Sequence, residues 1–257
     1  VDAANLELVL APTKREKHDF VSGKLAVIDP AACSACGRCA EVCRFDAVHP
    51  GDAYRVDPLA CEGCASCFYQ CPADAIQMQE QQAGYWFRSD TRFGPLFHAH
   101  LLAGQENSGK LVSTVKQQAA LWALDQDAAL LLVDGPPGIG CPVISASAGA
   151  DHALLVVEPT VSGVHDLERV LATTDHFGVA AMVVINKADL NQARSDEITA
   201  YCAAQEVEVV GQIPYDTVVT EAMVVGQPVT AADNVGGGHE VTQALQAVWS
   251  RIREAMQ

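Results

Sequence analysis

Two stretches decide how this chain folds: CSACGRCAEVC at Cys33–Cys43 and CEGCASCFYQC at Cys61–Cys71. They hold eight of the ten cysteines, in two copies of the spacing C-x2-C-x2-C-x3-C. A shift of 28 residues, from Cys33 to Cys61, lays one copy on the other. The match extends beyond the cysteines, with Ile28-Asp29-Pro30 falling on Val56-Asp57-Pro58 and Asp46-Ala47-Val48 on Asp74-Ala75-Ile76. The pattern indicates an internal duplication.

The spacing favours cubane iron–sulfur clusters. A cubane needs four thiolates, and the tight turns of C-x2-C aim three sulfurs and several backbone N–H groups at one point, while the fourth cysteine of each run ligates the other cluster. We therefore predict two 4Fe-4S clusters. The first quartet of ligands is Cys33, Cys36, Cys39 and Cys71; the second quartet is Cys43, Cys61, Cys64 and Cys67.

This segment resembles a bacterial two-cluster 4Fe-4S ferredoxin. Cys71-Pro72 matches the closing C-P of that family, whereas Cys43 is followed by Arg44. The alternatives are zinc, which usually takes two separated C-x2-C pairs, and a disulfide framework, which needs an oxidising compartment. Two interleaved quartets favour the clusters over both.

Length and charge limit the function classes. The chain has 257 residues, enough for one ordinary domain and a small module. Its formal net charge of -16, from 32 acidic and 16 basic residues, repels nucleic acid and anionic membrane surfaces. The sequence shows no apolar run near the roughly 18 residues of a membrane span and no signal peptide. Together with oxygen-sensitive clusters, these features predict a cytoplasmic protein.

The hydrophobic pattern predicts an α/β fold with a mostly parallel sheet and helices on both faces, because continuous apolar strands alternate with helices. We expect a small inserted α+β ferredoxin-like domain at 25–83, and a nucleotide-binding domain at 1–24 and 84–257. Residues 13–18 are expected to form a charged surface loop, and residues 25–28 a short strand. The expected strands of the larger domain are 95–102, 129–133, 153–157, 180–185 and 207–213, and its helices are 110–124, 164–176, 195–204, 218–225 and 240–256.

A candidate nucleotide site follows the expected strand 129–133. Asp134 ends that strand and precedes Gly135-Pro136-Pro137-Gly138-Ile139-Gly140. In an open α/β sheet, ligands bind at the carboxyl ends of the strands. A carboxylate there can orient water on a magnesium ion, and glycines such as Gly135 and Gly138 let backbone N–H groups approach a phosphate.

This larger portion resembles the MinD/Mrp-type ATPases, and in particular the subgroup that carries an inserted two-cluster ferredoxin. The resemblance implies ATP with Mg²⁺, with Asp134 as the catalytic residue that serves magnesium and Gly138 at the γ-phosphate. It places Asn186 at the adenine, with Asp189 and the loop from Pro214 to Asp216 lining the base pocket. The Asn-Lys-x-Asp pattern is also found in guanine sites, but the family favours ATP. The matching stretches are Asn5–Leu8, Glu106–Leu111, Asp134–Pro142, Ile185–Asp189 and Ile213–Asp216.

The phosphate loop departs from that family. The glycine-rich loop with its lysine, and the catalytic aspartate after it, would lie upstream of Val1, so we expect a fragment that does not hydrolyse ATP unaided. A look-alike, Gly104-Gln105-Glu106-Asn107-Ser108-Gly109-Lys110, fits G-x4-G-K. However, Leu111 replaces the Ser or Thr that binds magnesium, so a structural loop or accessory contact is the alternative to a working phosphate loop.

These features predict electron transfer to a redox partner protein, coupled to ATP binding and hydrolysis in the intact protein. The alternatives are a cluster assembly or maturation factor and an electron-carrier module without turnover. Mrp-type carriers hold a bridging cluster with a C-x-x-C near the C-terminus, and this chain has none after Cys71, which argues against cluster delivery. The resemblance also implies a homodimer or a pair with a paralogue.

Overall fold

The computed structural model describes residues 5–103, 105, 109–231 and 239–256. It divides into two compact units. We name them the cysteine unit, Glu16–Phe87 with His98–Glu106, and the sheet unit, Val1–Arg15 with Arg88–Phe97 and Asn107–Gln257. In the described part of the chain, no helix combines the length and apolar character needed to cross a membrane.

A three-stranded sheet of order β1-β4-β5 contributes most of its length to the cysteine unit. Its strands are β1 (Lys14–Ile28), β4 (Ile76–Thr91) and β5 (Gly94–Leu101). The prediction of a charged surface loop at 13–18 is therefore wrong for residues 14–18. Cross-strand contacts stabilise this charged stretch as a strand: His18 stacks on Trp86 with 4.0 Å between ring centroids, and Lys17 Nζ lies 3.4 Å from the centre of the Tyr85 ring.

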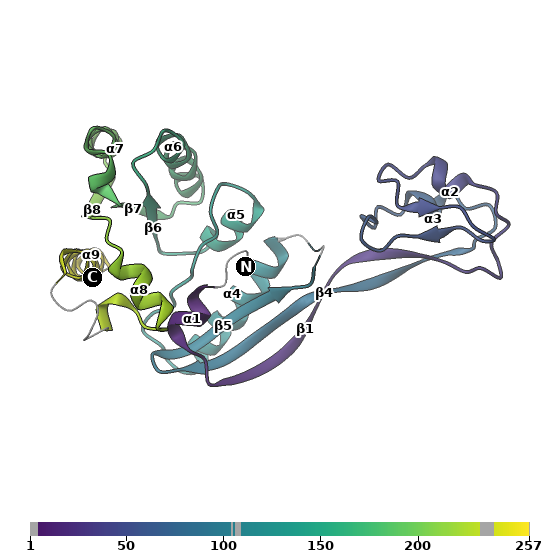
Figure 1. Ribbon diagram of the computed structural model, residues 1–257, viewed down its shortest axis with the longest axis horizontal. Coiled ribbons are helices and arrows are strands. Elements are labelled where there is room, and N and C mark those ends of the chain that lie inside the picture. Colours follow the sequence, from purple (N-terminus) through teal and green to yellow (C-terminus); the bar gives the residue numbers. More distant parts are fainter. Residues whose placement is uncertain (1–4, 104, 106–108, 232–238, 257) are drawn as a thin grey trace. The chain divides into compact units, whose positions relative to one another are not determined.

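The cysteines lie on short elements at the end of this sheet (Figure 1). These are the helices α2 (Arg38–Glu41) and α3 (Ser66–Tyr69), and the antiparallel strands β2 (Val48–His49) and β3 (Arg55–Val56). Their small core includes Ala26, Val48 and Ile76 as well as the buried Cys39 and Cys67. Each element is too short to be stable alone, so the module depends on this shared core.

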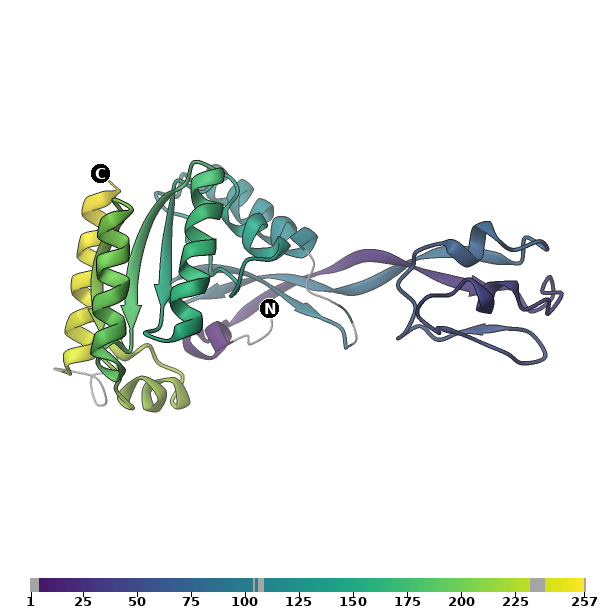
Figure 2. The same ribbon diagram turned by 90° about the horizontal axis from the view of Figure 1, so that it is seen from above.

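The sheet unit contains a parallel sheet of order β6-β7-β8, and Figure 2 shows its strands pointing the same way. The strands are β6 (His152–Val157), β7 (Ala180–Asn186) and β8 (Glu208–Ile213). Helices α6 (Val161–His176) and α7 (Gln192–Ala204) cover one face, and α8 (Val218–Val224) and α9 (Glu240–Ala255) the other (Figure 1). The predicted strands and helices of this region are confirmed to within a few residues.

Alternate residues of the central strand β7 pack into the two hydrophobic cores on opposite faces of the sheet. Val183 and Ile185 pack with Leu167 of α6 and Ile198 of α7, whereas Met182 and Val184 pack on the side of α8 and α9. A strand buried on both faces needs an unbroken apolar run, which β7 supplies. On β8, Gly211 allows α9 to approach closely, because a Cβ there would lie 2.5 Å from Val248 Cγ2.

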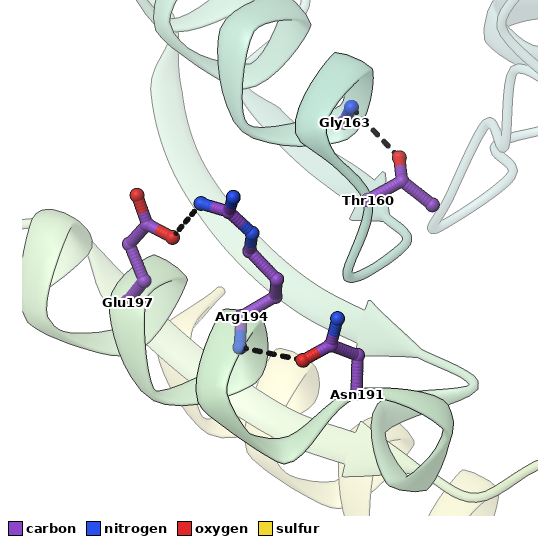
Figure 3. Close-up of polar contacts among 5 residues, drawn as sticks. All are labelled: Thr160, Gly163, Asn191, Arg194 and Glu197. Atoms are coloured by element: carbon purple, nitrogen blue, oxygen red, sulfur yellow. Dashed lines mark hydrogen bonds and ion pairs between the residues drawn. The ribbon is translucent and has the colours of Figure 1, made fainter.

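Polar side chains cap the two helices that begin beyond β6 and β7 (Figure 3). Thr160 Oγ1 accepts a hydrogen bond from Gly163 N at 2.9 Å at the start of α6, and Asn191 Oδ1 accepts one from Arg194 N at 3.2 Å at the start of α7. Arg194 also pairs with Glu197 one turn later. The caps satisfy backbone donors that have no partner within the helix.

The expected strand at 129–133 is absent from the described structure, which corrects the prediction of a mostly parallel sheet. Residues 129–134 form no helix or strand, and the side chain of Leu132 is 82% exposed. Among the described residues no strand pairs with the outer edge of β6, so the segment lacks the neighbour its backbone would need. The chain therefore has an α/β fold with one parallel sheet of three strands, beside the β1-β4-β5 sheet and the β2-β3 hairpin.

The remaining helices of the sheet unit are α4 (Gly109–Asp125) and α5 (Cys141–Ser147), which pack on each other, together with α1 (Asn5–Leu10). Short 3-10 turns lie at Ala188–Leu190 and Val229–Ala231. Lys116 of α4 donates to the carbonyls of Ala146 and Ala148 at 2.6 and 2.8 Å. These carbonyls end α5, so the lysine caps that helix, and burial lowers the pKa of its amine.

Candidate functional site

The two cysteine loops have the same backbone. Left-handed residues recur at a spacing of 28: Ala35 with φ 55° and Gly63 with φ 64°, Gly37 with φ 82° and Ala65 with φ 62°, and Asp46 and Asp74 with φ 50° each. Non-glycine residues seldom adopt this conformation. Their recurrence at matched positions shows that the duplication seen in the sequence is also a structural repeat.

Hydrogen bonds cross between the two copies in a reciprocal way. Asp29 N donates to Ala75 O at 2.8 Å, and its repeat partner Asp57 N donates to Ala47 O at 2.7 Å. Each aspartate also accepts from the backbone two residues on, with Oδ1 at 2.9 Å from Ala31 N and Leu59 N respectively. The end of each copy is therefore fixed beside the start of the other, which brings its fourth cysteine to the opposite loop.

The cysteines surround two separate hollows. One is lined by the first quartet together with Ile28, Arg38 and Tyr54. The other is lined by the second quartet together with Phe45, Glu62 and Met78. The eight thiols thus lie in two interleaved groups, with Cys71 beside the first loop and Cys43 beside the second.

The thiols differ in how readily they form thiolates, the form that binds metal. Burial raises the pKa of Cys39 and of Cys67, the cysteine at the corresponding place in each loop. A hydrogen bond with Ser66 lowers the pKa of Cys64, at 3.4 Å between Sγ and Oγ. Cys71 Sγ accepts a hydrogen bond from Ala75 N at 3.3 Å. Such bonds stabilise the negative charge of a ligating sulfur.

The cysteines form neither disulfides nor the ligand set of a single metal ion among the described residues. All ten cysteines are free thiols in the structure. Among the described residues, no group of three or more His, Cys, Asp or Glu side chains is placed to hold one metal ion. A zinc site requires four ligands at about 2.3 Å from one point. Four thiols spread around each hollow fit a multinuclear group better than one ion.

A second group of polar side chains lies at the carboxyl ends of β6, β7 and β8. Lys187 Nζ, just after β7, pairs with Glu158 Oε1, just after β6, at 2.7 Å, and this contact raises the pKa of the lysine. Asp189 Oδ1 accepts from Tyr215 N at 2.6 Å. The structure therefore brings Asp189 together with the loop from Pro214 to Asp216, beside Asn186 at the end of β7.

Asp216 is held in two ways. Its Oδ1 accepts from Val218 N at 3.0 Å, and its Oδ2 lies 3.1 Å from His239 Nδ1. The backbone hydrogen bond, followed by the histidine contact, lowers the pKa of this carboxyl. The histidine lies directly before α9, so this contact ties the start of that helix to the loop after β8.

Asp134, Gly135 and Gly138 are not joined to this group by any contact among the described residues. All three are exposed, and Asp134 forms no hydrogen bond or ion pair there. Gly138 has φ +85°, a conformation that suits glycine, and Gly140 begins α5. The structure therefore forms the predicted base-side residues as a group but leaves the predicted phosphate-side residues apart.

The G-x4-G-K look-alike falls partly on Gly104 and residues 106–108, which lie outside the described residues. Gly109 begins α4, and a Cβ there would come within 2.6 Å of Ser145 Oγ and 3.0 Å of the Cys141 carbonyl oxygen. This glycine is therefore required for the close approach of α4 and α5. Its place supports the alternative of a structural loop.

Three side chains of these sites escaped the sequence reasoning. Glu158 could have been found, since it is the first residue after an apolar strand, at the edge where ligands bind. Ser66 sits two residues after Cys64, where a hydroxyl can reach the sulfur. His239 gave no signal in the sequence, because its partner Asp216 lies 23 residues away.

Comparison with known proteins supports the iron–sulfur interpretation of the cysteine segment. Residues 26–49 match the family of 4Fe-4S binding domains. The chain is 37% identical over 191 residues to the uncharacterized protein MJ0578 of Methanocaldococcus jannaschii, covering 74% of this chain and 66% of that protein.

Further relatives connect the chain to nucleotide-binding and cluster-assembly proteins. It is 29% identical over 113 residues to the uncharacterized ATP-binding protein MJ0547 of the same organism, covering 44% of this chain and 43% of that protein. It is 28% identical over 144 residues to the cytosolic Fe-S cluster assembly factor Nubp1 homolog of Drosophila grimshawi, covering 48% and 45%. The chain thus spans two thirds or less of the length of these relatives.

Among solved structures, the septum site-determining protein MinD of Pyrococcus horikoshii OT3, complexed with Mg-ADP, aligns with a TM-score of 0.49. The alignment has 16% sequence identity and covers 98% of this chain and 79% of that chain. By its sequence matches alone, the chain combines a segment that matches 4Fe-4S binding domains with a portion similar to an ATP-binding protein.

Proposed function

We propose that the chain binds two 4Fe-4S clusters and transfers electrons through them, coupled to nucleotide binding. The observation that carries this proposal is the division of eight thiols between two hollows, each lined by one interleaved quartet. The first cluster would take Cys33, Cys36, Cys39 and Cys71, and the second Cys43, Cys61, Cys64 and Cys67. Bound there, the clusters supply one-electron redox chemistry.

The residues around each hollow have a defined task in this function. Apolar residues such as Ala26, Val48 and Ile76 exclude water from the inner side of the clusters, and burial of this kind shifts a reduction potential. The hydrogen bonds from Ala75 N to Cys71 Sγ and between Ser66 and Cys64 stabilise charge on the sulfur ligands. The protein therefore sets the potentials, while the clusters carry the electrons.

We assign the nucleotide to the carboxyl edge of β6, β7 and β8. In this proposal Asn186 binds the base, Asp189 with Pro214 and Asp216 lines its pocket, and Gly135 and Gly138 approach the phosphates. Asp134 would serve Mg²⁺ with ATP, which requires residues 129–133 to join the sheet beside β6. Hydrolysis is proposed for a protein that also carries a phosphate loop, with the domains divided at 1–24, 25–83 and 84–257.

The coupling acts through differential affinity. ATP can bias the protein between two conformations only by the difference in its affinity for them. We propose that ATP binding changes how a redox partner protein gains access to the clusters, and that a homodimer or a pair with a paralogue encloses the nucleotide. The redox partner and the paired subunit belong to this proposal alone.

The test is anaerobic reconstitution of the chain, followed by iron and sulfide analysis and electron paramagnetic resonance of the reduced protein. We expect an iron and sulfide content that requires both quartets, and an electron paramagnetic resonance signal from each of two cubane clusters. The coupling is tested on a protein that also carries a glycine-rich phosphate loop. ATP or ADP is added to the reduced protein, and the rate of electron release to a soluble acceptor is measured. Iron-free protein would refute cluster binding, and a rate indifferent to ATP would refute the coupling.

A second candidate, cluster assembly, is favoured by the similarity to the Nubp1 homolog. An assembly factor gives up its clusters, whereas an electron carrier keeps them. Incubation of the loaded protein with an apo-ferredoxin, followed by gel filtration and iron analysis of each fraction, separates the two. Transfer of iron and sulfide to the acceptor would favour assembly; retention of both clusters favours electron transfer.

A further inference from the structure

The surroundings of the two quartets differ in their exposed apolar side chains. Among described residues 26–79, the large apolar side chains that face solvent are Phe45, Leu59, Phe68 and Tyr69, exposed by 44, 74, 40 and 81%. At the matched positions of the other copy stand Ala73, Ala31, Ala40 and Glu41. Because the two copies have similar backbones, the fold does not require large apolar residues at these positions. The difference therefore points to a role of the surface they form.

Each of the four side chains lies within two residues of a second-quartet cysteine in the sequence. Phe45 also lines the hollow of that quartet. Leu59 lies two residues before Cys61, and Phe68 and Tyr69 follow Cys67 on α3, with their rings in edge contact at 5.1 Å. Aromatic side chains exposed to this degree are unusual on a surface and are enriched where proteins bind each other.

The corresponding helix beside the first quartet is polar and its side chains are paired. On α2, Arg38 forms an ion pair with Glu41 at 3.0 Å and donates to Gln70 Oε1 at 3.3 Å. Glu41 holds the place that Tyr69 has in the second copy. The exposed side chains of α3 are therefore aromatic, whereas those of α2 are polar and paired.

Charge specifies the kind of partner. Residues 26–79 contain seven acidic side chains (Asp29, Glu41, Asp46, Asp52, Asp57, Glu62 and Asp74) and three basic ones (Arg38, Arg44 and Arg55). Glu62 lines the second hollow, and Asp57 precedes Leu59 in the same turn. A partner that complements this surface has an apolar centre flanked by lysine or arginine side chains.

We propose that Phe45, Leu59, Phe68 and Tyr69 form the docking surface for a one-electron acceptor protein with a basic rim, and that the second cluster is the port through which electrons leave. This inference rests on the proposed electron-transfer function. In each transfer, the reduced second cluster loses one electron and the acceptor gains one. The first cluster then refills the second by the same one-electron step.

The experiment uses the reconstituted chain, reduced anaerobically and freed of reductant. Cytochrome c, a basic one-electron acceptor protein, serves as the partner probe, and dichlorophenolindophenol serves as a small acceptor that needs no docking surface. The double variant Leu59→Ser with Tyr69→Ser is compared with the matched double variant Ala31→Ser with Glu41→Asp in the other copy, which keeps the negative charge. Iron content is measured for each protein before any rate.

We expect the rate to cytochrome c at limiting concentration to fall about tenfold in the Leu59/Tyr69 variant, because removal of one strong apolar contact weakens binding by at least this factor. The matched variant should change the rate less than about twofold, as exposed positions outside an interface do. Both variants should reduce the dye at the wild-type rate. Equal rates to cytochrome c in both double variants would overturn the proposal.

A second variant tests the docking surface if the Leu59/Tyr69 double variant does not retain its iron. Glu62→Lys leaves the apolar side chains in place and adds a positive charge beside the same hollow, so it should slow cytochrome c reduction and weaken the dependence of the rate on salt. An unchanged rate would overturn the docking surface. So would a wild-type dimer, seen by sedimentation, that the Leu59/Tyr69 change dissociates, because a second copy would then cover this face.

Failure of the proposed function shows separately from failure of this inference. Protein without iron after reconstitution refutes cluster binding before any acceptor is added. If the loaded proteins reduce the dye normally but the two double variants reduce cytochrome c at the same rate, only the docking surface is refuted.

Discussion

The cysteine module and the nucleotide edge differ in how far each is assembled within this chain. All eight thiols lie between Cys33 and Cys71, and hydrogen bonds between the two copies fix both quartets around their hollows. At the proposed nucleotide edge, Asp189 and Asp216 accept hydrogen bonds from the backbone N–H groups of Tyr215 and Val218, whereas Asp134 lies on a segment outside the sheet. The first site is complete from local sequence, and the second is half formed.

The difference shows that a site is fully assembled only when each segment that carries its residues is paired with a neighbour. The cysteine loops supply their own partners, because each copy pairs with the other. Residues 129–133 have the composition of a buried strand, yet a strand needs a paired edge to satisfy its backbone.

The largest effect concerns which cysteines share a cluster. The double variant Cys33→Ser with Cys71→Ser removes two ligands of the first quartet and should leave the second cluster intact, so iron and sulfide fall by about half. The double variant Cys33→Ser with Cys43→Ser removes one ligand from each quartet and should damage both clusters. Iron analysis and electron paramagnetic resonance of the reduced proteins provide the measurement.

The same pair of variants can contradict the interleaved arrangement. If each run of four cysteines held its own cluster, the Cys33/Cys43 protein would keep one cluster and the Cys33/Cys71 protein would lose both. That outcome would show that the exchange of hydrogen bonds between Asp29 and Ala75, and between Asp57 and Ala47, does not place the fourth cysteines as described.

Core substitutions compare a strand that is formed with one that is not. Ile185→Ala on β7 removes a fully buried side chain and should lower the free energy of unfolding by about 2–5 kcal/mol. Leu132→Ala changes a side chain that is 82% exposed and should stay within about 0.5 kcal/mol. Denaturant unfolding followed by circular dichroism measures both. A loss at Leu132 as large as that at Ile185 would mean that residues 129–133 are packed in this chain.

The helix caps test the half of the nucleotide edge that is formed. Thr160→Ala and Asn191→Ala each remove a side-chain acceptor for an N-terminal N–H group, and should lower the free energy of unfolding by about 0.5–2 kcal/mol. Thr160→Ser keeps a hydroxyl and serves as the control. Alanine variants as stable as wild type would show that water satisfies these helix ends equally well.

The smallest effect is the pH dependence contributed by Asp216. Its pKa is lowered in the folded protein, so the carboxylate stabilises the fold above the ordinary pKa of an aspartate, and that stability is lost as pH falls through the lowered value. The melting temperature of Asp216→Asn should therefore fall less than that of wild type between about pH 6 and pH 3. Asp151→Asn, at an exposed carboxylate, is the control. Parallel curves for wild type and Asp216→Asn would contradict the assignment.

Much of the fold follows from sequence pattern alone. The strands β6, β7 and β8 and the intervening helices were predicted correctly, because each strand is a short apolar run and the helices have a different period. Of these three strands, only β7 is buried on both faces. Two segments failed for opposite reasons. Residues 14–18 look like a loop but pair with aromatic side chains of β4, and residues 129–133 look like a strand but find no neighbour in the described structure.

The candidate sites divide in the same way. Spacing grouped the eight cysteines, since ligands of one cluster must come from short loops whose geometry the intervening residues fix. It could not find His239 beside Asp216, or the contact of Lys187 with Glu158, because these pairs join different strands and helices.

By itself, the sequence determined the duplication, the spacing of the eight cysteines and the apolar strands of the parallel sheet, because each depends on residues close together in the chain. The tertiary structure alone decided which large apolar side chains face solvent and where charged side chains meet at the ends of the strands. It also decided that an apolar segment stays outside the sheet. Those outcomes depend on neighbours brought from a distance, and pairing across a sheet leaves no mark on the spacing of a single strand.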